Sequence, residues 1–189
     1  MKLHKGALEM LSTELFIATF SRRYKIALLV IALAITASFV ILTEQQTKQK
    51  DSANIINIAG EQRMLSQRIA LLIFNIQASP KSNIDTFTKL QHARNKIINN
   101  QKYLEKKLHL VDIELKQLLE SYFYGDIKLV ERVEKYAELA QDIINKKKQT
   151  FTEFEQFNRE QLLIDLHQVV ILFEKSSDTQ QISLSLIHI

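Results

Sequence analysis

The sequence contains no cysteine, three glycines and one proline among its 189 residues. Without cysteine, the chain can form no disulfide, no thiolate metal site and no cysteine nucleophile. Glycine and proline are the residues that most often interrupt helices, and the remainder is rich in helix formers such as Leu, Ile, Lys and Gln. These absences predict an all-α protein made of a few long helices, with length for one domain and one membrane segment.

The net charge of +4 is unevenly distributed. Basic residues dominate the stretch before and at the start of an apolar run, namely Lys2, Lys5, Arg22, Arg23 and Lys25 against Glu9 and Glu14. Beyond this run, acidic and basic residues are nearly balanced. No basic stripe interleaved with aromatic residues is present, so we expect no nucleic-acid partner. The asymmetry is typical of a membrane protein whose basic end stays in the cytoplasm.

The apolar run covers residues 24–42 and carries no charge after Lys25. At about 1.5 Å per residue, a helix of this length nearly spans a hydrocarbon core of roughly 30 Å. A cleaved signal peptide would have a shorter apolar core, and a charge-free run this long is rare in a small soluble domain. We therefore predict a cytoplasmic segment at 1–23, a transmembrane helix at 24–43, and a chain that lies in the periplasm of a bacterial inner-membrane protein from residue 44 onward.

Beyond the membrane segment, apolar residues recur at alternating three- and four-residue steps. They predict a first helix at about 44–79, continuous with the membrane helix, whose seam is Ile55, Ile58, Gln62, Leu65, Ile69, Leu72 and Ile76. Pro80 is expected to end this helix, and Ser82 with Asp85 to cap the next one.

Three further helices are predicted. The second, at about 83–108, would point Ile84, Phe87, Leu90, Ile97, Leu104 and Leu108 inward, and a short third, at about 112–124, would use Leu115, Leu118, Leu119 and Tyr122. Gly125 would stop the third helix in a left-handed conformation, and Asp126 would cap a very long fourth helix reaching about residue 178. Residues 44–183 would then form an antiparallel up-down four-helix bundle.

The last six residues, LSLIHI at 184–189, match one reading frame of a widely used transposase sequencing adapter. We interpret them as read-through from a truncated gene and exclude them from the fold. The natural chain would then continue past about residue 183 into a second membrane helix.

One segment, DSANIINIAGEQRMLSQRIA at 51–70, has an unusual density of hydrogen-bonding residues for a helix with an apolar seam. Gly60 lies in mid-helix, where it costs roughly 1 kcal/mol relative to alanine. Helices tolerate this where a backbone or a ligand comes close. At about 100° per residue, Gly60, Arg63 and Gln67 share one face, and Asn57 extends it.

This segment resembles the first-helix signature of PilJ-type and nitrate/nitrite-sensor periplasmic domains, roughly Asn-x-Ala-Gly-x-x-Arg-Met-x-Ser-x-Arg. The matching positions here are Asn57, Ala59, Gly60, Arg63, Met64, Ser66 and Arg68. The resemblance implies that a small oxyanion binds between two copies of this helix through the first motif arginine, Arg63. Together with the shared helix face, this makes Arg63, Asn57, Gly60 and Gln67 the candidate ligand-binding residues.

Physical chemistry supports this implication for Arg63. Two guanidinium groups near a dimer axis repel each other, and an anion between them relieves the repulsion. Arginine also offers planar paired donors to nitrate or carboxylate. Glu61, as in the chemotaxis-transducer branch, stands close by and argues against nitrate selectivity. An ion pair with an acid on a neighbouring helix, or a hydrogen bond at a dimer interface, is the alternative role of Arg63.

No catalytic or metal-binding pattern is present. The histidines, His4, His92, His109, His167 and His188, are scattered and form no i, i+4 pair. No phosphate loop, nucleophile elbow or kinase motif occurs. We therefore expect neither enzyme activity nor a cofactor.

The sequence as a whole predicts a homodimeric, membrane-anchored sensory module of a histidine kinase, a chemotaxis transducer or a cyclic-dinucleotide enzyme. The alternative is a structural or protein-interaction bundle anchored in the same membrane. Its signature would be a broad exposed apolar patch, together with an Arg63 that is already paired within the monomer.

Overall fold

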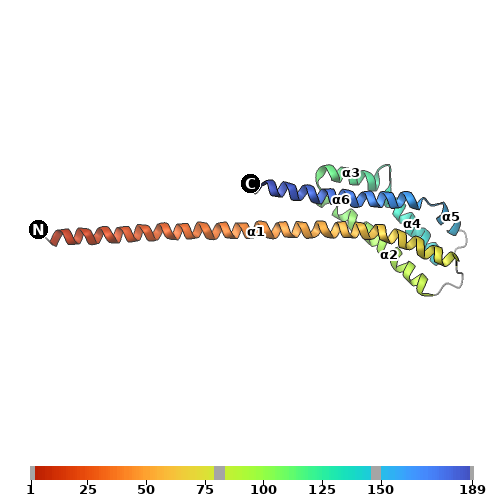
Figure 1. Cartoon of the computed structure of the whole chain (residues 1–189), viewed down its shortest axis with the longest axis horizontal. Coiled ribbons are helices and arrows are strands. Elements are labelled where there is room, and N and C mark those ends of the chain that lie inside the picture. Colours follow the sequence, from red (N-terminus) through yellow and green to blue (C-terminus); the bar gives the residue numbers. More distant parts are fainter. Residues whose placement is uncertain (1–2, 79–83, 146–149, 188–189) are drawn as a thin grey trace. The chain divides into compact units, whose positions relative to one another are not determined.

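The computed structural model describes residues 3–78, 84–145 and 150–187, with side chains described from Ser21 to Thr179 within these ranges. The described elements are all helical (Figure 1): α1 (Leu3–Ala78), α2 (Ile84–Lys107), the short 3-10 helix η1 (Leu108–Leu110), α3 (Ile113–Tyr124), α4 (Leu129–Ile144), α5 (Thr150–Gln156) and α6 (Arg159–Ile187). The predicted all-α helical bundle is confirmed. The chain divides into two units, Met1–Lys48 and Gln49–Ile189.

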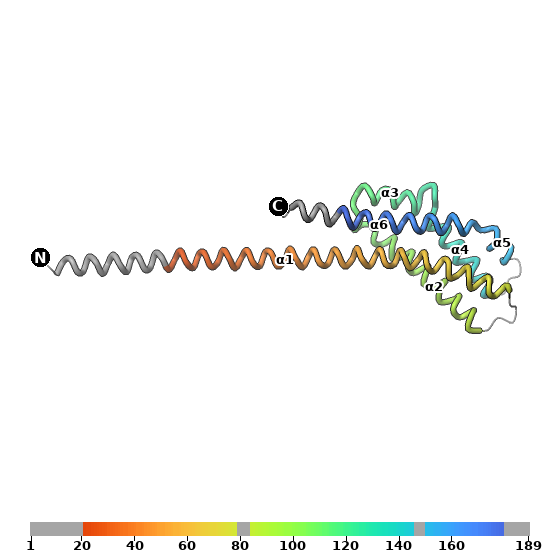
Figure 2. The backbone as a smooth tube through the Cα atoms, viewed as in Figure 1, coloured from red at the N-terminus to blue at the C-terminus, as the bar shows by residue number. Residues whose placement is uncertain are grey.

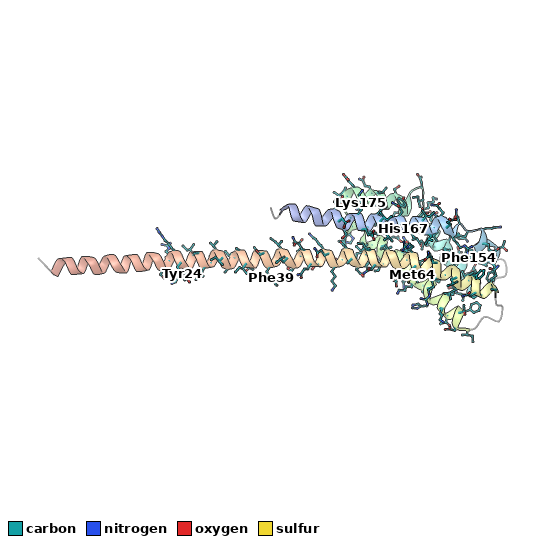
Figure 3. All side chains as sticks on the ribbon, viewed as in Figure 1. Tyr24, Phe39, Met64, Phe154, His167 and Lys175 are labelled. Carbon is teal, nitrogen blue, oxygen red and sulfur yellow. The ribbon has the colours of Figure 1, made fainter. Side chains whose placement is uncertain are left out.

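The first unit is the N-terminal part of α1. Its apolar side chains between residues 24 and 42 are exposed, as Phe39 is to 66%, and Figure 3 shows Tyr24 and Phe39 projecting from the helix. The hydroxyls of Thr36 and Ser38 donate to carbonyls one turn earlier, at 2.8 and 2.9 Å, so their polarity is satisfied within the helix. By length and composition, α1 is the one helix in the described part of the chain that could cross a membrane.

In the second unit, α1 from residue 49 onward, α2, α4 and α6 run alternately up and down (Figures 1 and 2). Side-chain contacts link each helix to the next around a closed ring: Gln62–Gln101 joins α1 to α2, Gln91–Gln141 joins α2 to α4, Arg132–Asp165 joins α4 to α6, and His167–Arg63 joins α6 back to α1. The short α3 packs outside this ring against α4 and α6.

The core lies along the predicted seam of α1. Of the seven seam residues, Ile58 is half-buried and the others are buried, with Ile69 at 0% and Gln62 at 1% exposure. Two residues expected inside are exposed instead: Ile84 to 84% and Leu118 to 44%. Ile84 is the first residue of α2, and Leu118 lies at the edge of the face of α3 formed by the buried Leu115, Leu119 and Phe123.

The predicted single fourth helix is wrong, because its sequence forms α4, α5 and α6. The side chain of Asn158 caps α6 by accepting a hydrogen bond from the backbone N–H of Gln161 at 3.0 Å. The chain reverses between α4 and α6, so that Phe154 stacks on Tyr136 with ring centroids 5.4 Å apart. A straight helix would have kept these rings apart and left both apolar faces uncovered.

The predicted turn after α3 is also wrong in detail. Gly125 has φ −81° rather than a left-handed conformation, and the residue at the N-cap position of α4 is Lys128 rather than Asp126, without a capping hydrogen bond from its side chain. Lys128 takes the left-handed conformation instead, with φ 50°. Gly125 is needed for space, because a Cβ there would lie 2.5 Å from the carbonyl oxygen of Ser121.

Some predictions fall outside the described residues. Pro80 and Ser82 belong to residues 79–83, which the structure does not describe. The helix α6 reaches Ile187, but the side chains of residues 184–189 are not described, so the adapter interpretation stays a prediction.

The buried pair Gln62–Gln101 gives a test of how α1 and α2 are held together. Gln62 Nε2 donates to Gln101 Oε1 at 2.6 Å, while Gln62 Oε1 and Gln101 Nε2 have no partner in the described part of the chain. Replacing Gln62 alone by leucine would leave the Gln101 amide buried and unpaired, and should lower the free energy of unfolding by about 1–3 kcal/mol.

The double variant Gln62→Leu/Gln101→Leu should cost clearly less than the sum of the two single variants, because it leaves no orphaned amide. Denaturant unfolding of the full chain in detergent measures all three. Strictly additive losses would contradict a coupled pair.

Candidate functional site

The four candidate residues lie on one outward-facing stripe of α1. Asn57, Arg63 and Gln67 are exposed, and Gly60 is half-buried. They occupy the side of α1 opposite the buried seam, since helical residues three or four apart share a face. The structure therefore brings the four together on a surface rather than around a closed pocket.

Arg63 is held by a residue that the sequence did not suggest as its partner. Its Nη1 lies 2.9 Å from His167 Nδ1 on α6. A guanidinium only donates, so Nδ1 accepts and the imidazole proton sits on Nε2. No carboxylate lies within ion-pair distance of Arg63 among the described residues, so its positive charge is not neutralised there. His167, one of the scattered histidines of the sequence, thus joins α6 to the motif.

Gly60 has open space where a side chain would be. A Cβ built on it meets nothing within 4 Å. Among the described residues, no other segment therefore approaches Gly60 closely. No contact among the described residues therefore requires a glycine at this position.

Glu61 is bound on the α2 side of the motif. Its carboxylate forms an ion pair with Lys96 and accepts a hydrogen bond from Asn100 Nδ2 at 3.0 Å. The hydrogen bond from Lys96, and then that from Asn100, hold the pKa of Glu61 below its ordinary value. Glu61 is thus engaged with α2 and does not neutralise Arg63.

Ser66 connects the motif to α4. The buried hydroxyl of Tyr136 donates to the Ser66 carbonyl at 2.7 Å. Burial raises the pKa of Tyr136 well above its usual range, while the nearby charge of Arg159 acts in the opposite direction. The centroids of the Tyr136 and Phe157 rings are also 5.4 Å apart. Tyr136 therefore packs α4 against the junction of α5 and α6.

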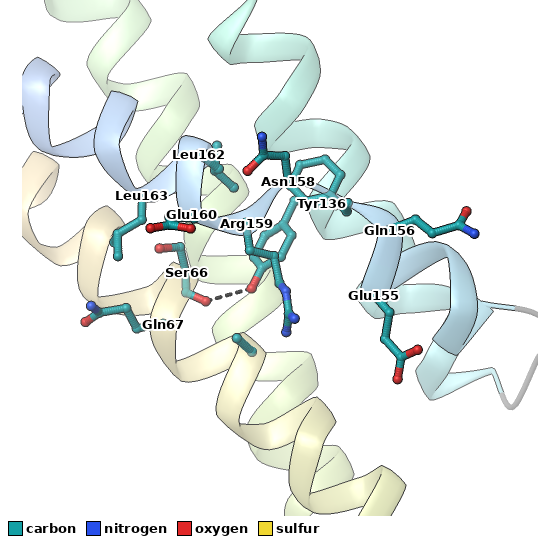
Figure 4. Close-up of a pocket in the computed structure, with 12 residues that line it drawn as sticks. Ser66, Gln67, Tyr136, Glu155, Gln156, Asn158, Arg159, Glu160, Leu162 and Leu163 are labelled. Carbon is teal, nitrogen blue, oxygen red and sulfur yellow. Dashed lines mark hydrogen bonds between the residues drawn. The ribbon is translucent and has the colours of Figure 1, made fainter.

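A cleft opens beside this tyrosine (Figure 4). It has a volume of about 640 Å³ and is bordered by Ser66, Gln67 and Ala70 of α1, Tyr136 of α4, and residues 155–160 with Leu162 and Leu163. Gln67 is the one candidate residue from the sequence that borders it. This cleft was not predicted from the sequence, because it depends on the break between α5 and α6 at Asn158. An asparagine followed by charged residues was the available signal for that break.

Metal binding has no support from side-chain placement. No group of three or more His, Asp or Glu residues is suitably gathered in the part of the chain that the structure describes.

Comparison with protein families identifies the chain. The family model described as the type IV pili methyl-accepting chemotaxis transducer N-terminal region, PilJ, matches residues 45–152. The chain belongs to this family. The match includes the motif at 51–70 and ends within α5, so Arg159 and His167 lie outside it. Comparison with curated proteins and with solved structures gives no match.

Membership gives the general role of the chain. PilJ domains are the N-terminal sensory regions of membrane-bound chemotaxis transducers, not catalytic domains. The chain is therefore an input module of a signalling receptor, and α1 carries an apolar segment suited to a membrane-bound protein.

Proposed function

We propose that this PilJ domain is a homodimeric, extracytoplasmic ligand-input module that binds a small oxyanion between the Arg63 side chains of two protomers. The observation that carries the proposal is an outward Arg63 without a carboxylate partner in the described residues, next to a glycine with open space. Two such arginines facing each other would repel, and an anion accepting hydrogen bonds from both would remove the repulsion.

The outer stripe of α1, which we define as Asn57, Gly60, Met64, Gln67, Leu71 and Phe74, supports the dimer. Its members alternate three and four residues apart, the spacing of a coiled-coil seam. Met64, Leu71 and Phe74 are 50%, 59% and 63% exposed. An apolar row of this kind on a helix is typical of a surface that binds another helix. Gly60 would let the two backbones approach at the level of Arg63.

The contact between Arg63 and His167 supports a route for the signal. An anion that attracts the guanidinium competes with His167 for the same donors, and so weakens one tie between α1 and α6. Ligand binding would then favour a different arrangement of these two helices, as expected of an element biased between two states. The output domain would be a histidine kinase, a chemotaxis domain or a cyclic-dinucleotide enzyme.

A structural or protein-interaction bundle is the second candidate. The exposed apolar side chains of the outer stripe and the hydrogen bond of Arg63 within the protomer both favour it. The two candidates differ in whether Arg63 binds an anion, and a titration distinguishes them.

Arg63→Ala should abolish the response to anions. Full chain in lipid nanodiscs is titrated with nitrate, nitrite, sulfate and acetate, and binding is followed by calorimetry and thermal unfolding. At least one anion should bind wild type, and Arg63→Ala should weaken it at least tenfold, because paired charged hydrogen bonds are lost.

Arg68→Ala is the matched control, since it removes the same charge from the same helix about 140° away around the axis. This variant should bind like wild type, and His167→Ala should bind several-fold more tightly, because Arg63 is released. Failure of every anion to bind, or equal losses in Arg63→Ala and Arg68→Ala, would refute the anion site and leave the interaction bundle.

Gly60→Ala tests the dimer. Alanine should raise helix stability by up to about 1 kcal/mol, because the open space around Gly60 accepts a methyl group. The same methyl group should raise the dimer dissociation constant at least tenfold by separating the two helices. Sedimentation equilibrium in density-matched detergent measures the second effect, and Asn99→Ala on the exposed side of α2 is the control. An unchanged dissociation constant would move the interface away from Gly60.

Membrane topology completes the proposal: residues 1–23 in the cytoplasm, a transmembrane helix at 24–43 in the bacterial inner membrane, and residues 44–183 in the periplasm. The excess of Lys and Arg before the apolar segment supports this orientation. Because the chain has no cysteine, single-cysteine variants report on it directly. An impermeant maleimide should label Thr152→Cys in intact spheroplasts and Ser12→Cys only after lysis. The opposite pattern would reverse the topology.

A further inference from the structure

The cleft at the start of α6 is bordered by Gln67 but not by Arg63. Its walls come from α1, α4, α5 and α6 of one protomer, and its volume of about 640 Å³ is in the range of small-molecule sites. Figure 4 shows the Arg159 side chain extending from the beginning of α6 alongside the ring of Tyr136. What the cleft could bind depends on the charges at its rim.

Arg159 supplies a cation with unused hydrogen-bond donors. Its guanidinium carbon lies 5.0 Å from the centroid of the Phe154 ring, which holds the group in place by a cation–π contact. Among the described residues, no carboxylate lies within ion-pair distance of it. The planar, multiply donating group is therefore available for a carboxylate.

Glu160 supplies the opposite charge at the same rim. It follows Arg159 directly, and it also has no ion-pair partner in the described part of the chain. The other carboxylate of the cleft, Glu155, already accepts a hydrogen bond from Gln77 Nε2 at 2.7 Å. One guanidinium and one carboxylate thus border the same cleft without pairing with each other.

The floor between these charges is apolar. Tyr136 and Leu162 are buried at 1% and 0% exposure, and Ala70, Phe157 and Leu163 are half-buried beside them. The two carboxylates of the rim would repel a simple anion, and Arg159 would repel a simple amine. A small zwitterion with an apolar side chain matches the guanidinium, the carboxylate and the apolar floor at the same time.

We propose that this cleft binds a free α-amino acid with an apolar side chain. Its carboxylate accepts hydrogen bonds from Arg159, its ammonium group donates to Glu160, and its side chain packs on the floor formed by Tyr136, Phe157 and Leu162. Because Gln67 of α1 and the first turn of α6 both border the cleft, the bound molecule bridges the two helices that Arg63 and His167 also join. The domain then has a second input that does not use Arg63.

The probe is L-leucine, titrated by calorimetry into the full chain in lipid nanodiscs. Wild type should bind it, and isoamylamine and 4-methylpentanoate, which lack the carboxylate and the ammonium group respectively, should each bind at least tenfold more weakly. Arg159→Gln should lower the affinity for L-leucine at least tenfold without weakening isoamylamine, because the variant removes the charge that repels the amine. Glu160→Gln should lower the affinity for L-leucine at least tenfold without weakening 4-methylpentanoate, because the variant removes a charge that repels the anion.

Arg68→Gln and Glu174→Gln are the matched controls, and both should bind L-leucine like wild type. Glu174 is an exposed carboxylate farther along α6. Far-UV circular dichroism confirms that each variant is folded. Absence of L-leucine binding at 10 mM (roughly the weakest affinity that calorimetry resolves) overturns the proposal. The proposal is also overturned if the two analogues bind as tightly as L-leucine, or if Arg68→Gln loses as much affinity as Arg159→Gln. Because nitrate binding at Arg63 is measured separately, either site can fail while the other stands.

Discussion

Each long helix of the bundle makes a polar contact with α1 within residues 62–66. Gln62 bonds Gln101 of α2, the Ser66 carbonyl accepts from Tyr136 of α4, and Arg63 donates to His167 of α6. The contacts lie within little more than one helical turn, so they point in different directions around α1. The segment that gives the chain its family resemblance is therefore also the place where the four helices are joined.

This arrangement explains why a sensory role suits the fold. A residue that merely filled the core would respond little to a molecule at the surface. Arg63, in contrast, has its backbone in the joined segment and its guanidinium at the surface. Ser66 and Gln67 follow Arg63 by about one helical turn, and they border the cleft that Arg159 also borders. Molecules bound at either place would act on the same pair of helices, α1 and α6.

The sequence was sufficient where structure is determined by local periodicity. The three- and four-residue spacing predicted α1 from residue 44 onward, its seam from Ile55 to Ile76, and the limits of α2 and α3 to within about a residue or two. The apolar run predicted the helix at 24–43, whereas the start of α1 at Leu3 was not predicted. The spacing failed between residues 145 and 159, where no glycine or proline marks the breaks. There the chain reversal is stabilised by the packing of Phe154 on Tyr136. These residues are 18 positions apart, and they can touch only if the chain reverses between them. For the same reason, the contacts of Arg63 with His167 and of Glu61 with Lys96 could not be predicted from the sequence. They depend on which helices pack against each other, and that is not a local property. The sequence pattern at 51–70 singled out Arg63 and Gln67. It could not predict that Arg63 contacts His167 or that Gln67 borders a cleft, because both depend on the fold.

The polar contacts of α1 also restrict how it can move. An entirely apolar seam would let α1 slide along its neighbours with a gradual loss of packing. A slip of one turn, about 5.4 Å, exceeds the reach of a hydrogen bond and would separate Gln62 from Gln101. Both amides are buried, at 1% and 2% exposure, and leaving each unpaired costs about 1–3 kcal/mol. Positions of α1 away from the observed register are therefore disfavoured. A well-defined register suits an input module, because a ligand that prefers another arrangement of the helices shifts the population between two states, whereas it would only slightly displace a helix that moves freely.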